Sequence, residues 1–125
     1  MPKTKVESVL LLKEDYPILK DRFGNVIEEG DIVCYPVRDR HDIEMYLVPA
    51  KIRSWDCRQV IEANGELGKC YFVIRVWVIS EDEKGNKTPK RTAINENRRM
   101  LRIDKNVIAE RDEEVAQLCT LPIED

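Results

Sequence analysis

The chain has 125 residues, a length typical of one domain, and it can bury a core large enough to fold without a metal or a disulfide. Hydrophobic residues make up 42% of the chain and charged residues 36%, a balance that argues against disorder of the whole chain. The formal net charge of −3 lacks the strongly basic character of many nucleic-acid binders, although it leaves room for a local basic patch.

The apolar runs and the cysteines bear on the cellular compartment. No run approaches the ~20 apolar residues of a membrane-spanning helix, and Val9 to Leu12 is too short for the core of a signal peptide. We therefore expect a cytoplasmic protein. Its four cysteines, Cys34, Cys57, Cys70 and Cys119, form no Cys-x-x-Cys pair and are expected to be free thiols. Cys34 and Cys70 lie inside apolar runs, so we expect them in the core.

The first part of the chain contains an ambiguous segment and two turns. Residues 6–12 form an apolar run that fits a helix or a strand, since periodicity cannot assign so short a run. Pro17 ends this element in either case, because its ring disfavours a helical residue before it. Two turn signals follow, Phe23-Gly24-Asn25 and Glu29-Gly30-Asp31. The second leads into an apolar run over 32–37, which predicts a strand.

Two prolines interrupt the expected strands. Pro36 cannot donate a ladder hydrogen bond, so the strand over 32–37 is expected to end there or to lie at a sheet edge. The charged stretch 38–44 is typical of a loop. A longer strand is expected over 45–55, with a β-bulge at Pro49.

Three further elements follow before the C-terminal region. Alternating residues over 69–79 predict a second long strand, after a loop that contains Asn64-Gly65. Residues 81–91 are expected to form an exposed, mobile hairpin connection, because they are almost entirely polar. Another strand is expected around 100–103.

The last part of the chain has helical character. Asp112 is a suitable N-cap, and the acidic residues at 113 and 114 favour a helix N-terminus. Three apolar residues share one helical face: Val115, Leu118 and Cys119. We therefore expect a helix over 112–119, ended by Pro122.

Short strands with frequent turns and a C-terminal helix predict a mainly β fold (α+β), arranged as a small barrel or sandwich in a single domain over 1–125. The stretch 21–38, Asp-Arg-Phe-Gly-Asn-Val-Ile-Glu-Glu-Gly-Asp-Ile-Val-Cys-Tyr-Pro-Val-Arg, resembles the opening of small SH3-like barrel accessory proteins of tailed bacteriophages. In those proteins a Gly-Asn turn and a Gly-Asp turn precede the first long strand. The resemblance covers about residues 21–55, and more loosely the strand near 98–103. It implies an SH3-like barrel core over about 21–105 and a viral origin, and it carries over no catalytic residue.

The sequence offers no positive case for catalysis. Its only histidine, His41, is flanked by Asp39 and Asp42, and neighbouring carboxylates can stabilise a protonated base. It stands in a charged loop without a nucleophile partner, so we expect an ordinary exposed histidine. One histidine and scattered cysteines do not make a zinc site, and no P-loop, dinucleotide-binding or nucleophile-elbow motif is present. We expect no enzyme activity, no metal and no cofactor.

Strand alternation predicts one aromatic–cationic face. Alternate residues of the strand 69–79 are expected in the core: Cys70, Phe72, Ile74, Val76 and Val78. If this strand pairs with 45–55, the opposite faces merge into a patch of aromatic and cationic residues: Lys51, Arg53, Trp55, Tyr71, Arg75 and Trp77. Such patches anchor protein partners or stack nucleic-acid bases. Alternatively, the N-terminal segment or the C-terminal helix covers this face and makes its aromatic residues a second layer of core.

A second candidate surface is the basic stretch from 84 to 105. Its cations are Lys84, Lys87, Lys90, Arg91, Arg98, Arg99, Arg102 and Lys105, and an acidic tail follows. A basic stretch can bind phosphates, or it can be a solvated hairpin that pairs with the acidic tail.

We expect a non-enzymatic, protein-binding accessory module that engages a host or viral protein through the aromatic–cationic face. The alternative is a single-stranded nucleic-acid-binding protein that uses the same face together with the basic stretch, above all Lys90, Arg91, Arg98, Arg99 and Arg102. An enzyme ranks third. No membrane partner is expected, and the exposure of the two tryptophans decides between a binding face and a second layer of core.

Overall fold

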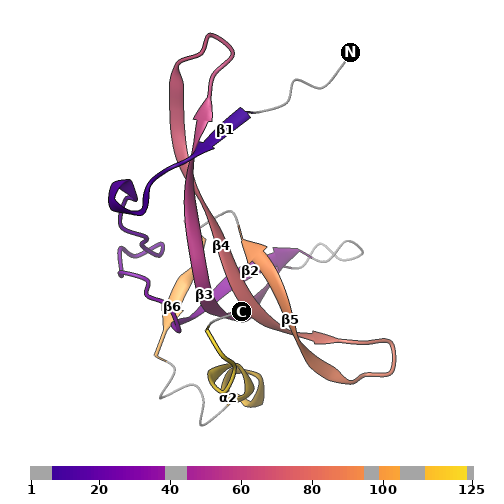
Figure 1. Cartoon of the computed structure of the whole chain (residues 1–125). Coiled ribbons are helices and arrows are strands. Elements are labelled where there is room, and N and C mark those ends of the chain that lie inside the picture. Colours follow the sequence, from indigo (N-terminus) through magenta and orange to yellow (C-terminus); the bar gives the residue numbers. More distant parts are fainter. Residues whose placement is uncertain (1–6, 39–44, 95–98, 105–111, 124–125) are drawn as a thin grey trace.

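The computed structural model describes residues 7–38, 45–94, 99–104 and 112–123 (Figure 1). These residues form one antiparallel sheet of six strands, a short 3-10 helix and one α-helix. In chain order the elements are β1 (Glu7–Leu10), η1 (Lys13–Asp15), β2 (Ile32–Arg38), β3 (Met45–Ile61), β4 (Leu67–Glu81), β5 (Lys87–Ile94), β6 (Leu101–Ile103) and α2 (Glu113–Cys119). Within these ranges no helix is long and apolar enough to cross a membrane.

The strand order is β5-β4-β3-β2-β6, and β1 pairs with β3 beside this path. The predicted mainly β fold with a C-terminal helix is therefore confirmed. The sheet is open over the described residues, with β5 and β6 at its two ends, so the SH3-like barrel stays a prediction. The expected loop over 38–44, with His41, lies outside the described residues except for Arg38, which ends β2.

The long strand β3 belongs to two parts of the sheet. Residues 45–51 pair with β2, and residues 51–61 pair with β4. β1 pairs with residues 58–61 of β3, along the same edge of β3 that pairs with β2 at residues 45–51. The outer part of the β3–β4 hairpin, residues 58–71, together with β1 forms a projecting arm (Figure 1).

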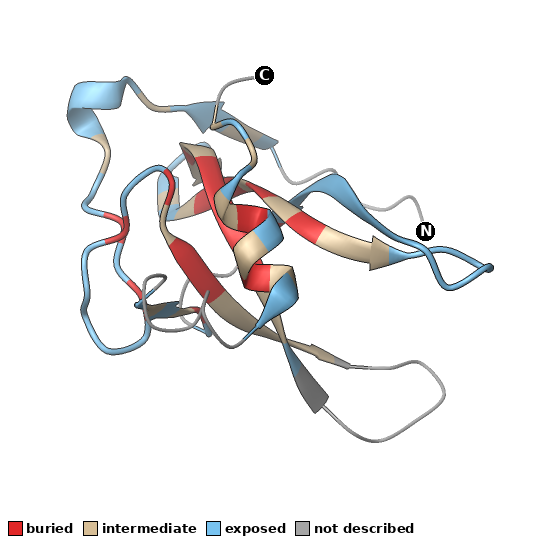
Figure 2. Ribbon diagram, turned by 90° about the horizontal axis from the view of Figure 1, so that it is seen from below, coloured by how far each residue is buried: buried red, intermediate tan, exposed pale blue. Residues whose placement is uncertain are grey.

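The two faces of the sheet are covered by different parts of the chain. The core face carries Val33, Ala50, Ile52, Ile74 and Val76, each fully buried against Leu19, Ile27 and Met100. The helix face carries Ile32, Trp77, Ile79 and Ile103, which pack against Val115 and Leu118 of α2 (Figure 2). The predicted helix is confirmed: Asp112 is its N-cap and accepts the amide N–H groups of Glu114 and Val115. The helix thus covers part of one face of the sheet.

The predicted bulge at Pro49 is wrong, and the bulge lies at Arg53 instead. Pro49 pairs with Cys34 in an unbroken ladder, whereas the register between β3 and β4 shifts after Ile52. Ile52 donates its N–H to Asp31 on the β2 side. Because successive residues of a strand point their N–H groups to opposite edges, the nitrogen of Pro49 faces the edge without a partner, where no donor is needed.

The two turns predicted near Gly24 and Gly30 are confirmed, and both glycines have positive φ, of 84° and 89°. Pro36 lies in β2 beyond the three residues that pair with β6, so its expected place at an edge is also confirmed. The ambiguous segment 6–12 contains a strand, β1, at Glu7–Leu10, and its first residue lies outside the described residues. The predicted connection 81–91 is wrong in part, because β5 begins at Lys87.

The predicted core contains one error among the cysteines. Cys70 is exposed and Cys34 is half-buried, while Cys57 is completely buried. Cys70 shares the core face with Phe72, but it lies on the arm, where nothing in the described part of the chain covers that face. The alternation of β4 was therefore correct for side-chain direction but could not indicate where the covering layer ends.

Candidate functional site

One of the six predicted residues, Trp55, does not belong to the predicted aromatic–cationic face. Lys51 stands opposite Trp77 on the helix face, whereas Trp55 stands opposite Ile74 on the core face. The extra residue at Arg53 reverses the alternation of β3, because one inserted residue moves every later side chain to the other face. The two tryptophans therefore lie on opposite faces of the sheet, so the prediction that both belong to one patch is wrong, whereas the predicted residues of β4 share one face as expected.

The part of this face around Trp77 is covered by the C-terminal segment. Lys51 is only 6% exposed, and its Nζ donates hydrogen bonds to the carbonyl oxygens of Cys119 and Leu121, at 3.1 and 2.6 Å. The Nε1–H of Trp77 donates to the carbonyl oxygen of Pro122 at 2.7 Å. A cation at a helix C-terminus satisfies carbonyls that have no intrahelical partner. Lys51 and Trp77 thus hold α2 in place.

Two arginines stack on the same indole. The guanidinium carbon of Arg53 lies 5.4 Å from the centre of the Trp77 ring, and that of Arg91 lies 4.9 Å from it. Arg53 is 5% exposed. These cation–π contacts account for the cations that the sequence placed beside Trp77, and they give Arg53 and Trp77 a structural role.

The remaining predicted residues, Tyr71 and Arg75, are also engaged. The hydroxyl of Tyr71 donates to the Oγ of Ser8 at 3.2 Å, so it is bonded to β1, a strand of the same sheet. Arg75 forms an ion pair with Asp56 and donates to the Oγ of Ser54 at 3.2 Å. The alternative expectation, that the N-terminal segment or the C-terminal helix covers the face, is met in part: the C-terminal segment covers Trp77, whereas β1 lies within the sheet.

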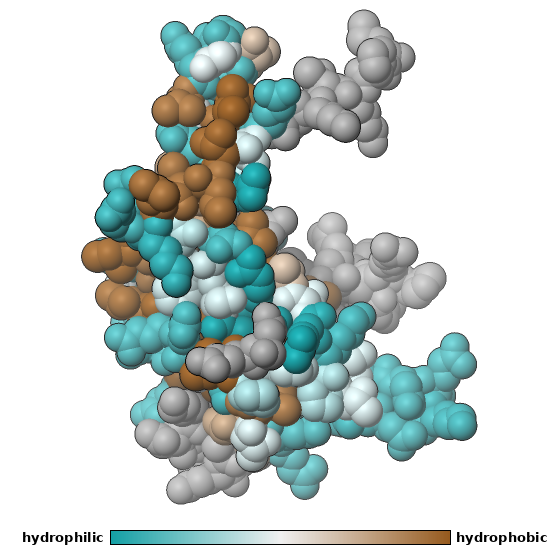
Figure 3. All heavy atoms as spheres, viewed as in Figure 1, coloured by the Kyte–Doolittle hydropathy of each residue, from teal (hydrophilic) through white to brown (hydrophobic). Residues whose placement is uncertain are grey.

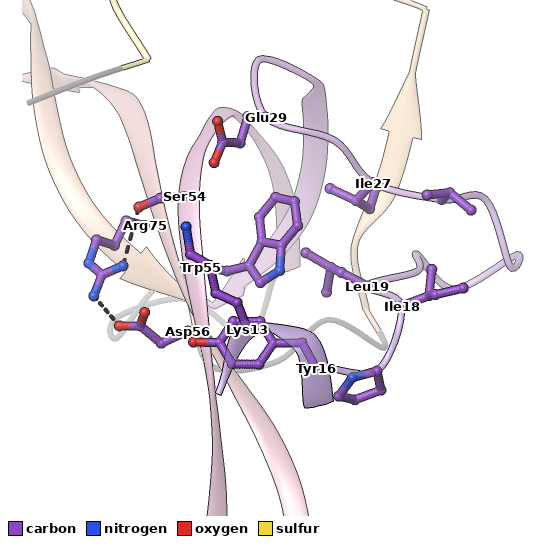
Figure 4. A pocket seen from close by; sticks show the side chains of 12 residues that line it. Lys13, Tyr16, Ile18, Leu19, Ile27, Glu29, Ser54, Trp55, Asp56 and Arg75 are labelled. Atoms are coloured by element: carbon purple, nitrogen blue, oxygen red, sulfur yellow. Dashed lines mark hydrogen bonds and ion pairs between the residues drawn. The ribbon is translucent and has the colours of Figure 1, made fainter. Parts of the chain in front are cut away.

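Trp55, on the core face, instead lines a pocket of about 520 Å³, which we call the Trp55 pocket (Figure 4). Its walls come from η1 and the segment after it, from the end of the first turn and from β3 and β4. The lining residues are Lys13, Tyr16, Pro17, Ile18, Leu19, Val26, Ile27, Glu29, Ser54, Trp55, Asp56 and Arg75. Of the six predicted face residues, only Trp55 and Arg75 reach it.

The N-terminal segment crosses the open side of β3 because of its local sequence. The 3-10 turn η1 and Pro17 lead the chain toward the sheet, where Leu19 is buried at 2% exposure in the core. In Figure 4 the indole of Trp55 reaches toward Leu19 and Ile27, with Tyr16 on one side and Glu29 on the other. A half-buried aromatic floor between two chain segments therefore results from the reversed alternation of β3.

The charged side chains of the pocket differ in whether they already form ion pairs. Asp56 and Arg75 neutralise each other at one side. The side chains of Lys13 and Glu29 form no hydrogen bond or ion pair with any described residue. An apolar floor with a few polar groups at the rim is the usual composition of a ligand-binding site.

Apolar side chains with large exposure surround the pocket and continue along the arm (Figure 3). Ile18, which forms part of the wall, is 66% exposed, and Phe23 in the neighbouring turn is 76% exposed. Further exposed apolar residues on the N-terminal segment and the arm are Val9, Leu10, Leu12, Val26 and Leu67. Contiguous exposed apolar surface is typical of interaction sites.

The basic stretch does not form one surface over the described residues. Lys90 and Arg91 lie on β5, and Arg102 lies on β6, at opposite ends of the strand order. Arg102 donates to the carbonyl oxygen of Val26 at 3.1 Å. Arg99 is exposed beside β6, and the predicted residues Arg98 and Lys105 lie outside the described ranges.

The acidic tail pairs with the basic stretch at one point. Lys87 forms a 3.0 Å ion pair with Glu114, which raises the pKa of Lys87 through that hydrogen bond and the attraction of the carboxylate. Lys87 and Lys90 also line a second hollow of about 670 Å³, between β2–β3 and β4–β5. This ion pair agrees with the solvated-hairpin interpretation of the stretch.

No family model, curated protein or solved structure matches the chain. The resemblance to phage accessory proteins therefore stays a prediction, and the function has to be argued from the site itself.

Proposed function

We propose that this protein is a protein-binding module and that an apolar segment of a partner polypeptide docks in the Trp55 pocket. The observation that supports it is the pocket itself, with Trp55 and Tyr16 as its floor and the exposed Ile18 as part of its wall. Aromatic side chains in a pocket are the usual anchors of protein interfaces, because they bury a large area and lose little conformational freedom.

The polar residues of the pocket suit a polypeptide partner. Lys13 and Glu29 carry opposite charges and line the same pocket without an ion pair to any described residue. Opposite charges at a rim orient a ligand more than they increase its affinity. An apolar anchor residue flanked by polar groups would meet both requirements. In the wider role, we propose an accessory module that engages a host or viral protein.

Single-stranded nucleic-acid binding has less support from the geometry. Trp77, which would stack on a base, is bonded to Pro122 and stacked by two arginines. Lys90 and Arg102 lie on strands at opposite ends of the sheet order, so they do not line one groove. An electrostatic groove along the backbone is what binding to single strands requires.

The test is a selection of binding peptides from a random displayed library, followed by affinity measurements on the variants. We expect selected peptides to lose at least about tenfold in affinity, ~1.4 kcal/mol, for Ile18→Asp and for Trp55→Ala. Leu67→Asp is the matched control, because Leu67 is 63% exposed on the arm and outside the pocket. It should bind as the parent protein does.

Two outcomes would count against the proposal. One is that no peptide is selected, or that the selected peptides bind all variants equally. The other is tight binding of a generic single-stranded oligonucleotide at ~0.15 M salt that decreases steeply as salt is raised. Because Ile18 is largely exposed, Ile18→Asp should stay folded, and it decides the matter if Trp55→Ala loses stability.

A further inference from the structure

The strand β1 has an outer edge that pairs with no described strand. Among the described strands its backbone pairs only with β3, and Leu11, just after it, donates its N–H to the carbonyl oxygen of Cys57 at 3.0 Å. In an antiparallel ladder the residues that bond to a given neighbour alternate. The backbone groups of Val9 and Glu7 therefore face β3 as those of Leu11 do, whereas those of Ser8 and Leu10 face outward.

The edge at β1 is less protected against pairing with another strand than the opposite edge of the sheet. On the outermost strand β5, Lys87, Pro89 and Lys90 are residues of the kind that block edge-to-edge pairing. The last three residues of β1 are Ser8, Val9 and Leu10, none of them charged. Val9 is 40% exposed and Leu10 is 55% exposed.

We propose that β1 pairs with β1 of a second copy of this chain, so that two arms join into one continuous sheet. In such a pair a twofold axis runs perpendicular to the sheet, and residues directly opposite each other lie on the same face. When the axis passes between the two Val9 residues, Ser8 of each copy stands opposite Leu10 of the other. Both residues have outward backbone groups, so the seam contains four backbone hydrogen bonds.

The side chains suit this register. Val9 meets Val9 of the copy at a non-hydrogen-bonded position, where cross-strand side chains are closest. Glu7 stands opposite Leu11 of the copy, so the two Glu7 carboxylates are about 13 Å apart along the strands and largely screened at physiological salt. The seam thus contains no like-charge contact and covers the exposed Val9 and Leu10.

The seam is short, so the dimer belongs to the class of small, weak interfaces and forms in a concentration-dependent way. Its test is sedimentation velocity from about 10 µM to about 1 mM, where the average mass should rise from monomer toward dimer. Hydrogen exchange measured over the same range should show growing protection of the amides of Ser8 and Leu10. The amide of Val9, already bonded to β3, should not change.

Substitutions at Leu10 separate this seam from general apolar association. Leu10→Pro removes an outward-facing N–H without removing a bond to β3, and Leu10→Lys places a charge at the seam. Both should abolish the dimer, and circular dichroism should confirm that they are folded. Leu67→Lys is the matched control, because Leu67 is 63% exposed on the arm but lies away from this edge.

Three results would overturn the proposal. They are a parent protein that stays monomeric up to about 1 mM, a dimer unaffected by Leu10→Lys, and a dimer that Leu67→Lys abolishes equally well. If Leu10→Pro unfolds the arm, Leu10→Lys and the exchange of the Ser8 amide decide. The outcome is independent of the peptide-binding pocket, because Leu10 does not line it.

Discussion

Two buried charged side chains connect segments that are far apart in the sequence. Asp21 lies in the first turn, and its Oδ2 accepts the backbone N–H of Arg102 in β6 at 2.9 Å. Lys51 lies in β3 and donates to the carbonyls at the end of α2. A buried charge is unfavourable unless hydrogen bonds satisfy it, and both side chains are satisfied by backbone groups. Each residue therefore offers a test of one long-range connection.

Replacing Asp21 with asparagine should destabilise the protein. Its carboxylate accepts the N–H groups of Phe23, Asn25 and Arg102 and the side-chain amide of Asn25, and it is 6% exposed. An asparagine side chain at this position would have one acceptor oxygen fewer, so we expect a loss of about 1–3 kcal/mol in the free energy of unfolding. Urea unfolding at neutral pH measures it.

Asp82→Asn is the matched control. Asp82 accepts the N–H groups of Lys84 and Asn86 in a turn of the same Asp-x-x-Gly-Asn pattern, but it is exposed. The control should lose clearly less stability than Asp21→Asn. Equal losses would mean that the turn geometry, and not the buried connection to Arg102, accounts for the effect.

The same carboxylate predicts part of the acid sensitivity. Burial alone raises the pKa of Asp21, but its hydrogen bonds outweigh burial and hold the pKa below the ordinary value. A depressed folded pKa stabilises the protein above the unfolded pKa, and this stabilisation disappears as pH falls through the folded pKa. Asp21→Asn should therefore show a shallower loss of stability in acid than the parent. Parallel curves would contradict the assignment.

Replacing Lys51 with methionine tests the connection between β3 and α2. Methionine keeps most of the side-chain length but removes both hydrogen bonds to the carbonyls of Cys119 and Leu121. Hydrogen bonds to a charged group contribute about 1.5–3 kcal/mol each, offset here by the easier burial of an apolar side chain. We expect Lys51→Met to lower stability on thermal unfolding and the exposed Lys90→Met to leave it unchanged. Greater stability of Lys51→Met would show that burying the charge outweighs its bonds.

At the scale of elements, α2 is short and depends on its packing. Seven residues are too few for a stable isolated helix, so the contacts of Val115 and Leu118 with the helix face must supply its stability. Asp112 contributes by satisfying amide groups at the N-terminus of the helix. The helix and the residues after it cover Trp77, so the indole can report on whether the helix is docked.

Leu118→Ala should loosen this helix. Leu118 is completely buried, and truncating a buried leucine costs about 2–5 kcal/mol. The fluorescence of Trp77 should shift to longer wavelength as the helix detaches, which a Trp55→Phe background isolates from the other tryptophan. Gln117→Ala, on the exposed side of the same helix, should leave both stability and fluorescence unchanged.

The elements that the sequence predicted correctly are those with a clear hydrophobic period. The core residues of β4, the turns at Gly24 and Gly30 and the capped helix all had local signals. β5 had no local signal, because seven of its eight residues are exposed and its pairing with β4 depends on backbone hydrogen bonds. The bulge at Arg53 left no trace in the hydrophobic pattern, since Arg53 and Ser54 are both polar. Because this bulge was not predicted, Trp55 was assigned to the wrong face and the pocket was not predicted.

At the scale of the whole molecule, the cysteines contribute as side chains and not as crosslinks. All four are free thiols, and Cys57 is completely buried in the core. Burial raises the pKa of the Cys57 thiol, and the neighbouring Cys70 raises it further, which keeps it protonated and unreactive.

Thermal unfolding should therefore be the same with and without a reductant or a chelator. Structural crosslinks and metals stabilise by about 2–5 kcal/mol or more, so their loss would lower the melting temperature by several degrees. A shift of that size with either reagent would show a crosslink or a bound metal. Limited alkylation should modify the exposed Cys70 before Cys57.

The sharing of β3 among β1, β2 and β4 also bears on the order in which the chain folds. β3 and β4 are joined by a short turn at Gly65, so closing this hairpin loses little chain entropy, whereas β1 and α2 reach β3 from distant parts of the sequence. We therefore expect the hairpin to form before either attaches and to be part of the folding nucleus. Destabilising substitutions within it should slow folding, and those in β1 or α2 should mainly hasten unfolding.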